Sequence, residues 1–107
     1  MPGMSRPEPT PDALRAAVAR VVPSRLPALT QHLFEAATNA HQTQSLAPLR
    51  AFVHSWAVLV AIECHPARAG RLRELERIVG AGGLDPTEAI AEIRSIREDA
   101  EAGLRGP

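Results

Sequence analysis

The chain contains no lysine and no tyrosine, and only one of its 107 residues is a cysteine, Cys64. A single cysteine can form neither an internal disulfide nor a cysteine zinc site. Two phenylalanines and one tryptophan are its only aromatic residues besides histidine. All 12 cationic residues are arginines, and 12 acidic residues balance them. A chain without net charge is not the strongly basic kind that coats nucleic acid, so this class of protein is excluded.

The sequence also lacks an apolar run long enough to cross a membrane. The longest run, Ala51 to Ile62, has about twelve residues and is interrupted by His54 and Ser55, whereas a membrane span needs about 20. The N-terminal segment has no apolar stretch of the kind that marks a secretory signal. Together with the single cysteine, these features predict a cytoplasmic protein.

Alanine and aliphatic residues dominate the composition, and apolar residues together make up 45% of the chain. This content is too high for a wholly disordered chain. Apolar residues recur at intervals of three and four, which is the period of an amphipathic helix, and no alternating strand pattern appears. The sequence therefore predicts an all-α protein.

Prolines and hydroxyl residues mark the first helix boundaries. Residues 1–10 are rich in proline and are predicted to form a disordered tail. Thr10, followed by a proline, predicts an N-cap and the first turn of a helix. Pro23 ends that helix because its ring clashes with a continuing helical backbone. Ser24 and Ser45 are the predicted N-caps of the second and third helices.

The third predicted helix, residues 46–63, is apolar on most of its sides. A helix of this kind is usually buried on most sides, so we expect it to be the central one. Trp56 lies near its middle, between further large apolar residues. We predict Trp56 as the core anchor, with Phe52 and Leu59 beside it.

A glycine-rich segment separates the last two predicted helices. The fourth helix covers residues 67–79, and Gly80-Ala81-Gly82-Gly83 predicts its end and a flexible joint. Asp85-Pro86-Thr87-Glu88 then carries the signals of a helix start. The resulting organisation is a core domain at 11–80, a hinge at 81–84, and an acidic amphipathic helix with its tail at 85–107. The predicted fold is a small four-helix bundle-like domain with a hinged C-terminal amphipathic helix.

The fifth predicted helix combines an apolar face with negative charge. Residues 85–107 carry a formal charge of −3, whereas residues 66–84 carry +2. The apolar face needs cover from the rest of the chain, from a second copy, or from another protein. Because its charge complements a basic surface, we predict that this helix binds a protein partner through Ile90, Ile93, Ile96, Ala100, Glu92 and Asp99.

The sequence offers little support for a catalytic, metal-binding or phosphate-binding site. Cys64 and His65 are adjacent, so on a helix they point about 100° apart and do not form a nucleophile–base pair. His32 and Glu35 have the reverse order of the Glu-x-x-His metal motif and lack its partner residues. The glycine segment has no Lys-Ser/Thr behind it, so it is not a phosphate loop. We therefore predict no catalytic site, no metal and no cofactor.

The basic fourth helix supports a second hypothesis. Following the third helix, it resembles the second half of a helix-turn-helix. Arg68, Arg71 and Arg77 are its candidate nucleic-acid contacts. Glu74 and Glu76 are interleaved with these arginines and no aromatic residue accompanies them, so nucleic acid is the less favoured partner.

The middle of the chain carries a distinctive set of residues: Leu46-Ala47-Pro48-Leu49, Phe52-Val53, Trp56 and His65-Pro66-Ala67. With these residues it resembles a family of short, uncharacterised, all-helical actinobacterial proteins that is known only as a domain of unknown function. The resemblance covers residues 11–80 and leaves out the fifth helix. His65 stands where the family has an aspartate before the proline. The resemblance implies no catalytic residues, and it implies that some members are partners of small toxins.

These observations favour a non-catalytic protein–protein interaction module over an enzyme. Its most concrete form is the antitoxin-like partner of a small basic protein. Two alternatives stay open: a DNA-binding regulator that uses the fourth helix, and a structural homodimer that pairs through the fifth. Neither alternative involves a membrane.

Overall fold

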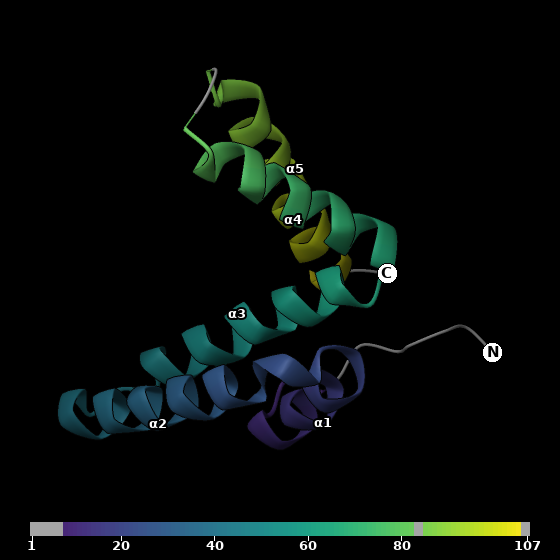
Figure 1. Ribbon diagram of the computed structural model, residues 1–107. Coiled ribbons are helices and arrows are strands. Elements are labelled where there is room, and N and C mark those ends of the chain that lie inside the picture. Colours follow the sequence, from purple (N-terminus) through teal and green to yellow (C-terminus); the bar gives the residue numbers. More distant parts are fainter. Residues whose placement is uncertain (1–7, 83–84, 106–107) are drawn as a thin grey trace. The chain divides into compact units, whose positions relative to one another are not determined.

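The computed structural model describes residues 8–82 and 85–105, and this part of the chain is helical without any strand. The predicted all-α fold is therefore confirmed. The elements are α1 (Pro11–Val21), the short 3-10 helix η1 (Pro23–Arg25), α2 (Leu26–Thr43), α3 (Ala47–Glu63), α4 (Pro66–Gly80) and α5 (Thr87–Arg105) (Figure 1). None of these helices taken singly is long and apolar enough to cross a membrane.

Three of the predicted helix starts are capped by the expected side chains. Thr10, Ser45 and Asp85 each accept a hydrogen bond from a backbone N–H two or three residues further on, at 3.2, 3.1 and 3.0 Å. These bonds satisfy N–H groups that the first turn of a helix leaves without a partner. At the end of α4, Gly82 has a φ of +66°, the left-handed conformation that glycine adopts without strain. The predicted stop of this helix is confirmed.

The start of α2 differs from the sequence-based prediction. Ser24 lies inside η1, and α2 begins only at Leu26 without a side-chain cap. The backbone N–H of Leu26 donates to the carbonyl of Pro23. The 3-10 turn therefore satisfies a backbone N–H at the start of α2, which is the role that was expected of the Ser24 hydroxyl. The serine hydroxyl is therefore not the cap.

The chain divides into two compact units, and the boundary lies inside α3, between Val60 and Ala61. The first unit holds α1, η1, α2 and most of α3, and the second holds the end of α3 with α4 and α5. The sequence placed the boundary at the glycine segment 81–84 instead. The difference arises because α4 packs with α5 in one compact unit. The predicted tail, up to residue 7, and joint residues 83–84 lie outside the described residues.

The core of the first unit brings α1, α2 and α3 together. Leu14 and Val18 of α1, Leu29 of α2 and Phe52 of α3 are fully buried in one cluster. Trp56 is 6% exposed and belongs to the same cluster, so its predicted place in the core is confirmed. The third residue predicted there, Leu59, is only partly buried and packs against this cluster.

His32 supplies the polar partner that the buried indole of Trp56 needs. The Trp56 Nε1–H donates a hydrogen bond to His32 Nδ1 at 2.9 Å. Since an indole nitrogen can only donate, Nδ1 is the acceptor and carries no proton. The imidazole also stands edge-on to the ring of Phe52, with 5.1 Å between ring centroids. The pair joins α2 to α3 without leaving a buried donor unsatisfied.

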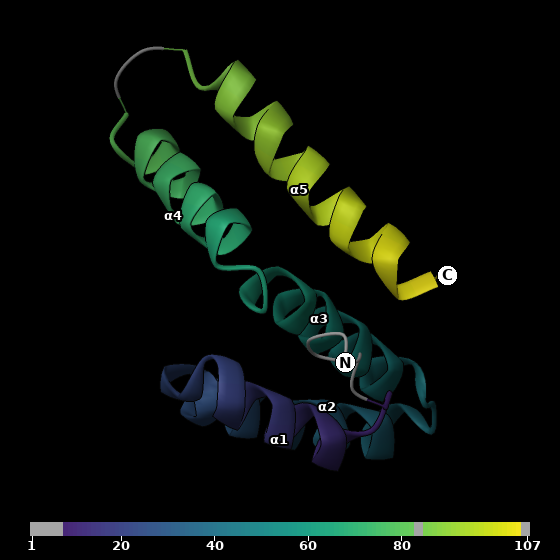
Figure 2. The same ribbon diagram turned by 90° about the vertical axis from the view of Figure 1, so that its right-hand side faces the viewer.

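The second unit is a helical hairpin. Figure 2 shows α4 and α5 side by side and running in opposite directions, and the two helices are in contact along the hairpin. Ala69, Leu72 and Leu75 form the buried stripe of α4, and Ala100 is the buried residue of α5. The hairpin is thus closed by small and aliphatic side chains.

Candidate functional site

The apolar face of α5 is partly buried within the chain, where α5 is in contact with α4. Ile93 and Ile96 are half-buried, and Ala100 is only 1% exposed. Packing within the chain, one of the three kinds of cover that the sequence left open, accounts for the burial of these residues. Ile90, near the start of α5, is the exception because 42% of its surface is exposed. The predicted partner-binding residues are therefore not one surface.

Glu92, another residue of that predicted set, is held by Arg71 of α4. Nε of Arg71 donates to Oε2 of Glu92 at 2.7 Å, and Nη2 donates to Oε1 at 2.8 Å. Arg71 also donates to Oε1 of Glu74, one turn along α4. A planar guanidinium matches a carboxylate in this two-bond manner, and an ammonium group does not. One arginine therefore binds two carboxylates and crosslinks α4 to α5.

These bonds shift the pKa values of the groups involved. Hydrogen bonds to Glu92 and then to Glu74 raise the pKa of Arg71. The same guanidinium lowers the pKa of the Glu92 carboxyl below its ordinary value. Stability from this pair is present at neutral pH and is lost as the pH falls through the lowered pKa. All three side chains are exposed enough for water to weaken the pair.

Carboxylates also accompany other arginines of the hairpin. Arg73 lies 3.5 Å from Glu63, and Arg97 lies 3.9 Å from Glu76. Of the three candidate nucleic-acid contacts, Arg71 is occupied as described above, Arg68 is half-buried and Arg77 is exposed. A phosphate backbone would have to compete with Glu74 and Glu92 for Arg71, which weakens the case for a DNA-binding helix.

We accordingly expect no measurable binding of the full chain to mixed-sequence duplex DNA at about 150 mM salt. Fluorescence anisotropy of a labelled duplex is the measurement. Because phosphate contacts release counterions, true binding would strengthen steeply as salt is lowered. Submicromolar binding that disappears in an Arg71→Ala/Arg77→Ala variant would instead support the DNA-binding alternative.

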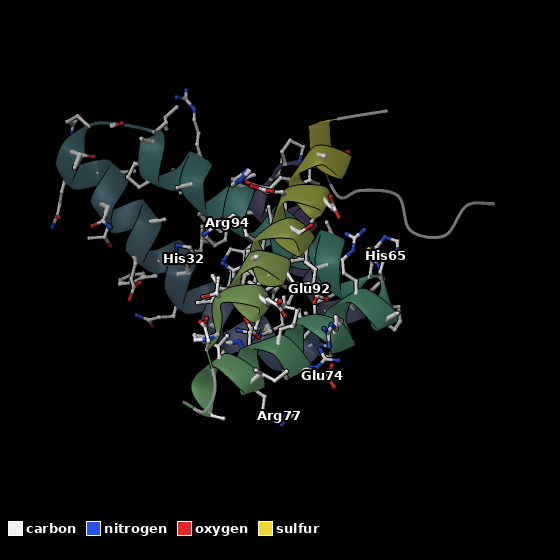
Figure 3. The ribbon with its side chains drawn as sticks, turned by 90° about the horizontal axis from the view of Figure 1, so that it is seen from above. His32, His65, Glu74, Arg77, Glu92 and Arg94 are labelled. Carbon is white, nitrogen blue, oxygen red and sulfur yellow. The ribbon has the colours of Figure 1, made fainter. Side chains whose placement is uncertain are left out.

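One side of the hairpin is acidic. Glu88 and Asp99 lie four residues before and seven residues after Glu92, so they follow it along one side of α5. Figure 3 shows Glu74 of α4 on the same side as Glu92, whereas Arg94 projects from the opposite side of α5. We call Glu74, Glu88, Glu92 and Asp99 the acidic side. Arg71 contacts Glu74 and Glu92, and Arg68 lies one turn before Arg71 on α4, where it is half-buried.

Two carboxylates of the acidic side have no ion-pair partner among the described residues. Glu88 and Asp99 are exposed, and neither forms an ion pair with a residue that the structure describes. Arg71 is already shared between Glu74 and Glu92. The acidic side therefore has a surplus of negative charge that faces solvent.

The remaining sequence candidates do not come together in a reactive site. The thiol of Cys64 donates to the carbonyl of Ala61 at 3.5 Å, and His65 is an exposed residue at the start of α4. His32 accepts from Trp56, as described above, so it serves the core. Within residues 8–82 and 85–105, no three His, Cys, Asp or Glu side chains are placed to hold a metal ion.

The helices and their charged hairpin place the chain in a class of small all-α proteins. Its sequence matches the family described as "Family of unknown function (DUF6247)" over residues 2–100, and the chain belongs to this family. The resemblance to an uncharacterised family is thus confirmed, but its extent was underestimated. The match continues through most of α5, so this helix belongs to the family's domain. No curated protein and no solved structure matches the chain.

Proposed function

We propose that the protein is a non-catalytic protein–protein interaction module, and most concretely the antitoxin-like partner of a small basic protein. The observation that supports this proposal is the acidic side of the hairpin, with Glu88 and Asp99 unneutralised. A basic surface would supply the missing cations, and complementary charge steers and orients such an encounter. The binding surface differs from the sequence-based expectation because Ala100 is buried and Ile93 and Ile96 are half-buried within the chain.

The hairpin also offers a rigid frame for this surface. Arg71 donates hydrogen bonds to Glu74 and Glu92, so two of the four carboxylates already have a bonded position before a partner arrives. Ordering side chains on binding costs conformational entropy, and a preordered surface reduces that cost. The proposal includes a cytoplasmic, actinobacterial setting, which is supported by the resemblance and by the arginine-only, alanine-rich composition.

The test is co-expression of the full chain with the small basic protein that we expect from the neighbouring gene. The two proteins should purify together, and their affinity should fall as salt is raised because the contact is between opposite charges. We expect Glu88→Arg/Asp99→Arg to weaken binding about 10-fold or more, as measured by calorimetry.

A matched control separates the acidic side from net charge. Glu35→Arg/Glu98→Arg makes the same change in net charge, but Glu35 lies on α2 and Glu98 points about 100° away from Asp99 on α5. This variant should bind within about threefold of the wild-type chain. Equal loss in both variants would contradict the proposed surface, and no co-purification would contradict the antitoxin-like role.

A further inference from the structure

His32 is a titratable side chain that lies against the core of the first unit. The residue is half-buried, and its ring stands beside the rings of Phe52, which is fully buried, and Trp56, which is 6% exposed. Its hydrogen bond with Trp56 joins α2 to α3. The function proposed above uses neither residue, so the pair is open to a role of its own.

The hydrogen bond determines which ring nitrogen of neutral His32 carries the proton. Trp56 Nε1 donates and His32 Nδ1 accepts, so the proton of the neutral imidazole is on Nε2. A second proton can be added only at Nδ1, which is the one ring nitrogen with a free lone pair in this form. The indole N–H already uses that lone pair.

Protonation of His32 therefore ends this hydrogen bond. In the imidazolium form both ring nitrogens are donors, so two N–H groups would face each other across 2.9 Å. The indole N–H would then be a buried donor without its acceptor, which costs stability because the group has left water. A positive charge would also be added beside a cluster whose buried members are all apolar.

The other ionisable groups of the surrounding helices are exposed to water. They are Asp12, Arg15 and Arg20 on α1, Arg25 in η1, Glu35 and His41 on α2, and Arg50 and His54 on α3. At the far end of α3, Glu63 pairs with Arg73 of α4. Glu35 lies three residues from His32, and its carboxylate accepts a hydrogen bond from Gln31. Its charge favours the imidazolium, but water weakens this attraction, whereas the bond to Trp56 lies at the edge of the core.

We propose that His32 is a proton-sensitive contact that couples the packing of α2 on α3 to pH. Neutral His32 holds Trp56, and protonated His32 releases it. In the unfolded chain water leaves Nδ1 free to take up a proton, whereas in the folded chain the indole N–H occupies it. The unfolded state therefore binds more protons as the pH falls through the range in which histidines titrate, and stability decreases in the same direction.

This effect is separate from the acid sensitivity of the hairpin. Hydrogen bonds from Arg71 hold the pKa of Glu92 below its ordinary value, so that contact stays ionised from about pH 7.5 to about pH 5.5. His32 and Trp56 lie in the first unit, whereas Arg71 and Glu92 lie in the second. The role of His32 is thus independent of the acidic side and of any partner that binds it.

Proton–nitrogen correlation NMR of the full chain, from about pH 7.5 to about pH 5.5, is the first test. Trp56 is the only tryptophan, so one indole N–H signal reports on the bond. This signal should shift as the His32 ring titrates, and His32 Nδ1 should carry no proton at the upper pH. An indole signal that stays fixed over the whole range would overturn the proposal, as would a proton on Nδ1 at the upper pH.

Urea unfolding at the two ends of this pH range, followed by the fluorescence of Trp56, is the second test. The folding equilibrium constant of the wild-type chain should fall about 10-fold toward the lower pH, the usual effect of leaving a buried donor unpaired. His32→Gln keeps an oxygen that can accept from Trp56 and removes the titration. Its folding equilibrium constant should change about twofold or less over the same range.

The matched control is His41→Gln, the same substitution at an exposed histidine of the same helix. This variant should keep the pH dependence of the wild-type chain. A His32→Gln variant as sensitive to pH as the wild-type chain would overturn the proposal, as would an equal loss of pH dependence in both variants. The NMR test needs no variant, so it decides the proposal even where His32→Gln lowers stability at every pH.

Discussion

Trp56→Ala is expected to lower the free energy of unfolding by about 3–5 kcal/mol, the usual cost of truncating a large buried aromatic side chain. The indole is 6% exposed and lies in the cluster shared by α1, α2 and α3. A small domain has about 5–15 kcal/mol of stability in total, so the variant should be partly unfolded at physiological temperature. Urea unfolding followed by circular dichroism is the measurement, since the substitution removes the only tryptophan.

Trp56→Phe separates packing from hydrogen bonding at the same position. This variant keeps an aromatic ring but removes the N–H that donates to Nδ1 of His32 at 2.9 Å. We expect a smaller loss of about 1–3 kcal/mol, because a partly buried acceptor is left unpaired and a smaller ring fills the space. Unfolding curves of Trp56→Ala and the wild-type chain that coincide would contradict the assignment of Trp56 to the core.

The second large effect is expected at the contact between α4 and α5. Leu75 of α4 is 2% exposed, and Leu75→Ala should cost about 2–5 kcal/mol because it removes buried carbon and leaves a cavity. A helix of 15 residues is marginal on its own in water, so α4 and α5 should lose their protection together. Hydrogen exchange by mass spectrometry, resolved by segment, is the measurement.

Ile78→Ala is the matched control on the same helix. Ile78 is 44% exposed, so its truncation should cost less than about 1 kcal/mol. Exchange in α1 and α2 should change less than exchange in α4 and α5 in the Leu75→Ala variant, because the hairpin is a compact unit of its own. Unchanged protection of α5 in that variant would contradict the packing of the hairpin.

Helix boundaries are the part of this fold that the sequence predicts well, because their causes are local. Thr10, Ser45 and Asp85 accept hydrogen bonds from the N–H groups just after them, and Gly82 adopts a conformation that suits glycine. Each of these signals lies within a few residues of the helix end it determines. Ser24 is the exception, because a hydrogen bond within the 3-10 turn satisfies the backbone N–H of Leu26 and no side-chain cap is present.

The cover of the α5 face was not predictable in the same way. An amphipathic pattern shows that a face needs cover, and it does not identify the covering surface. The two-bond contact joins Arg71 and Glu92, which are 21 residues apart, and neither residue is marked by a motif. The role of His32 as the hydrogen-bond acceptor of Trp56 was not predicted either. The available signals were that a buried tryptophan requires an acceptor and that His32 lies three residues from the core residue Leu29.

The small size of Ala100 also fixes how far α5 can slide along α4. Glu88 and Glu92 are one turn apart, so a shift of α5 by one turn would bring Glu88 to Arg71 in place of Glu92, and the contact with Arg71 alone would allow this shift. The same shift would move Ile96 into the position of Ala100, which is 1% exposed and surrounded by packed atoms. A branched four-carbon side chain does not fit where a methyl group is enclosed. The Arg71 contact is therefore compatible with two registers, and steric exclusion at one alanine, together with the Arg97–Glu76 pair, favours the observed one.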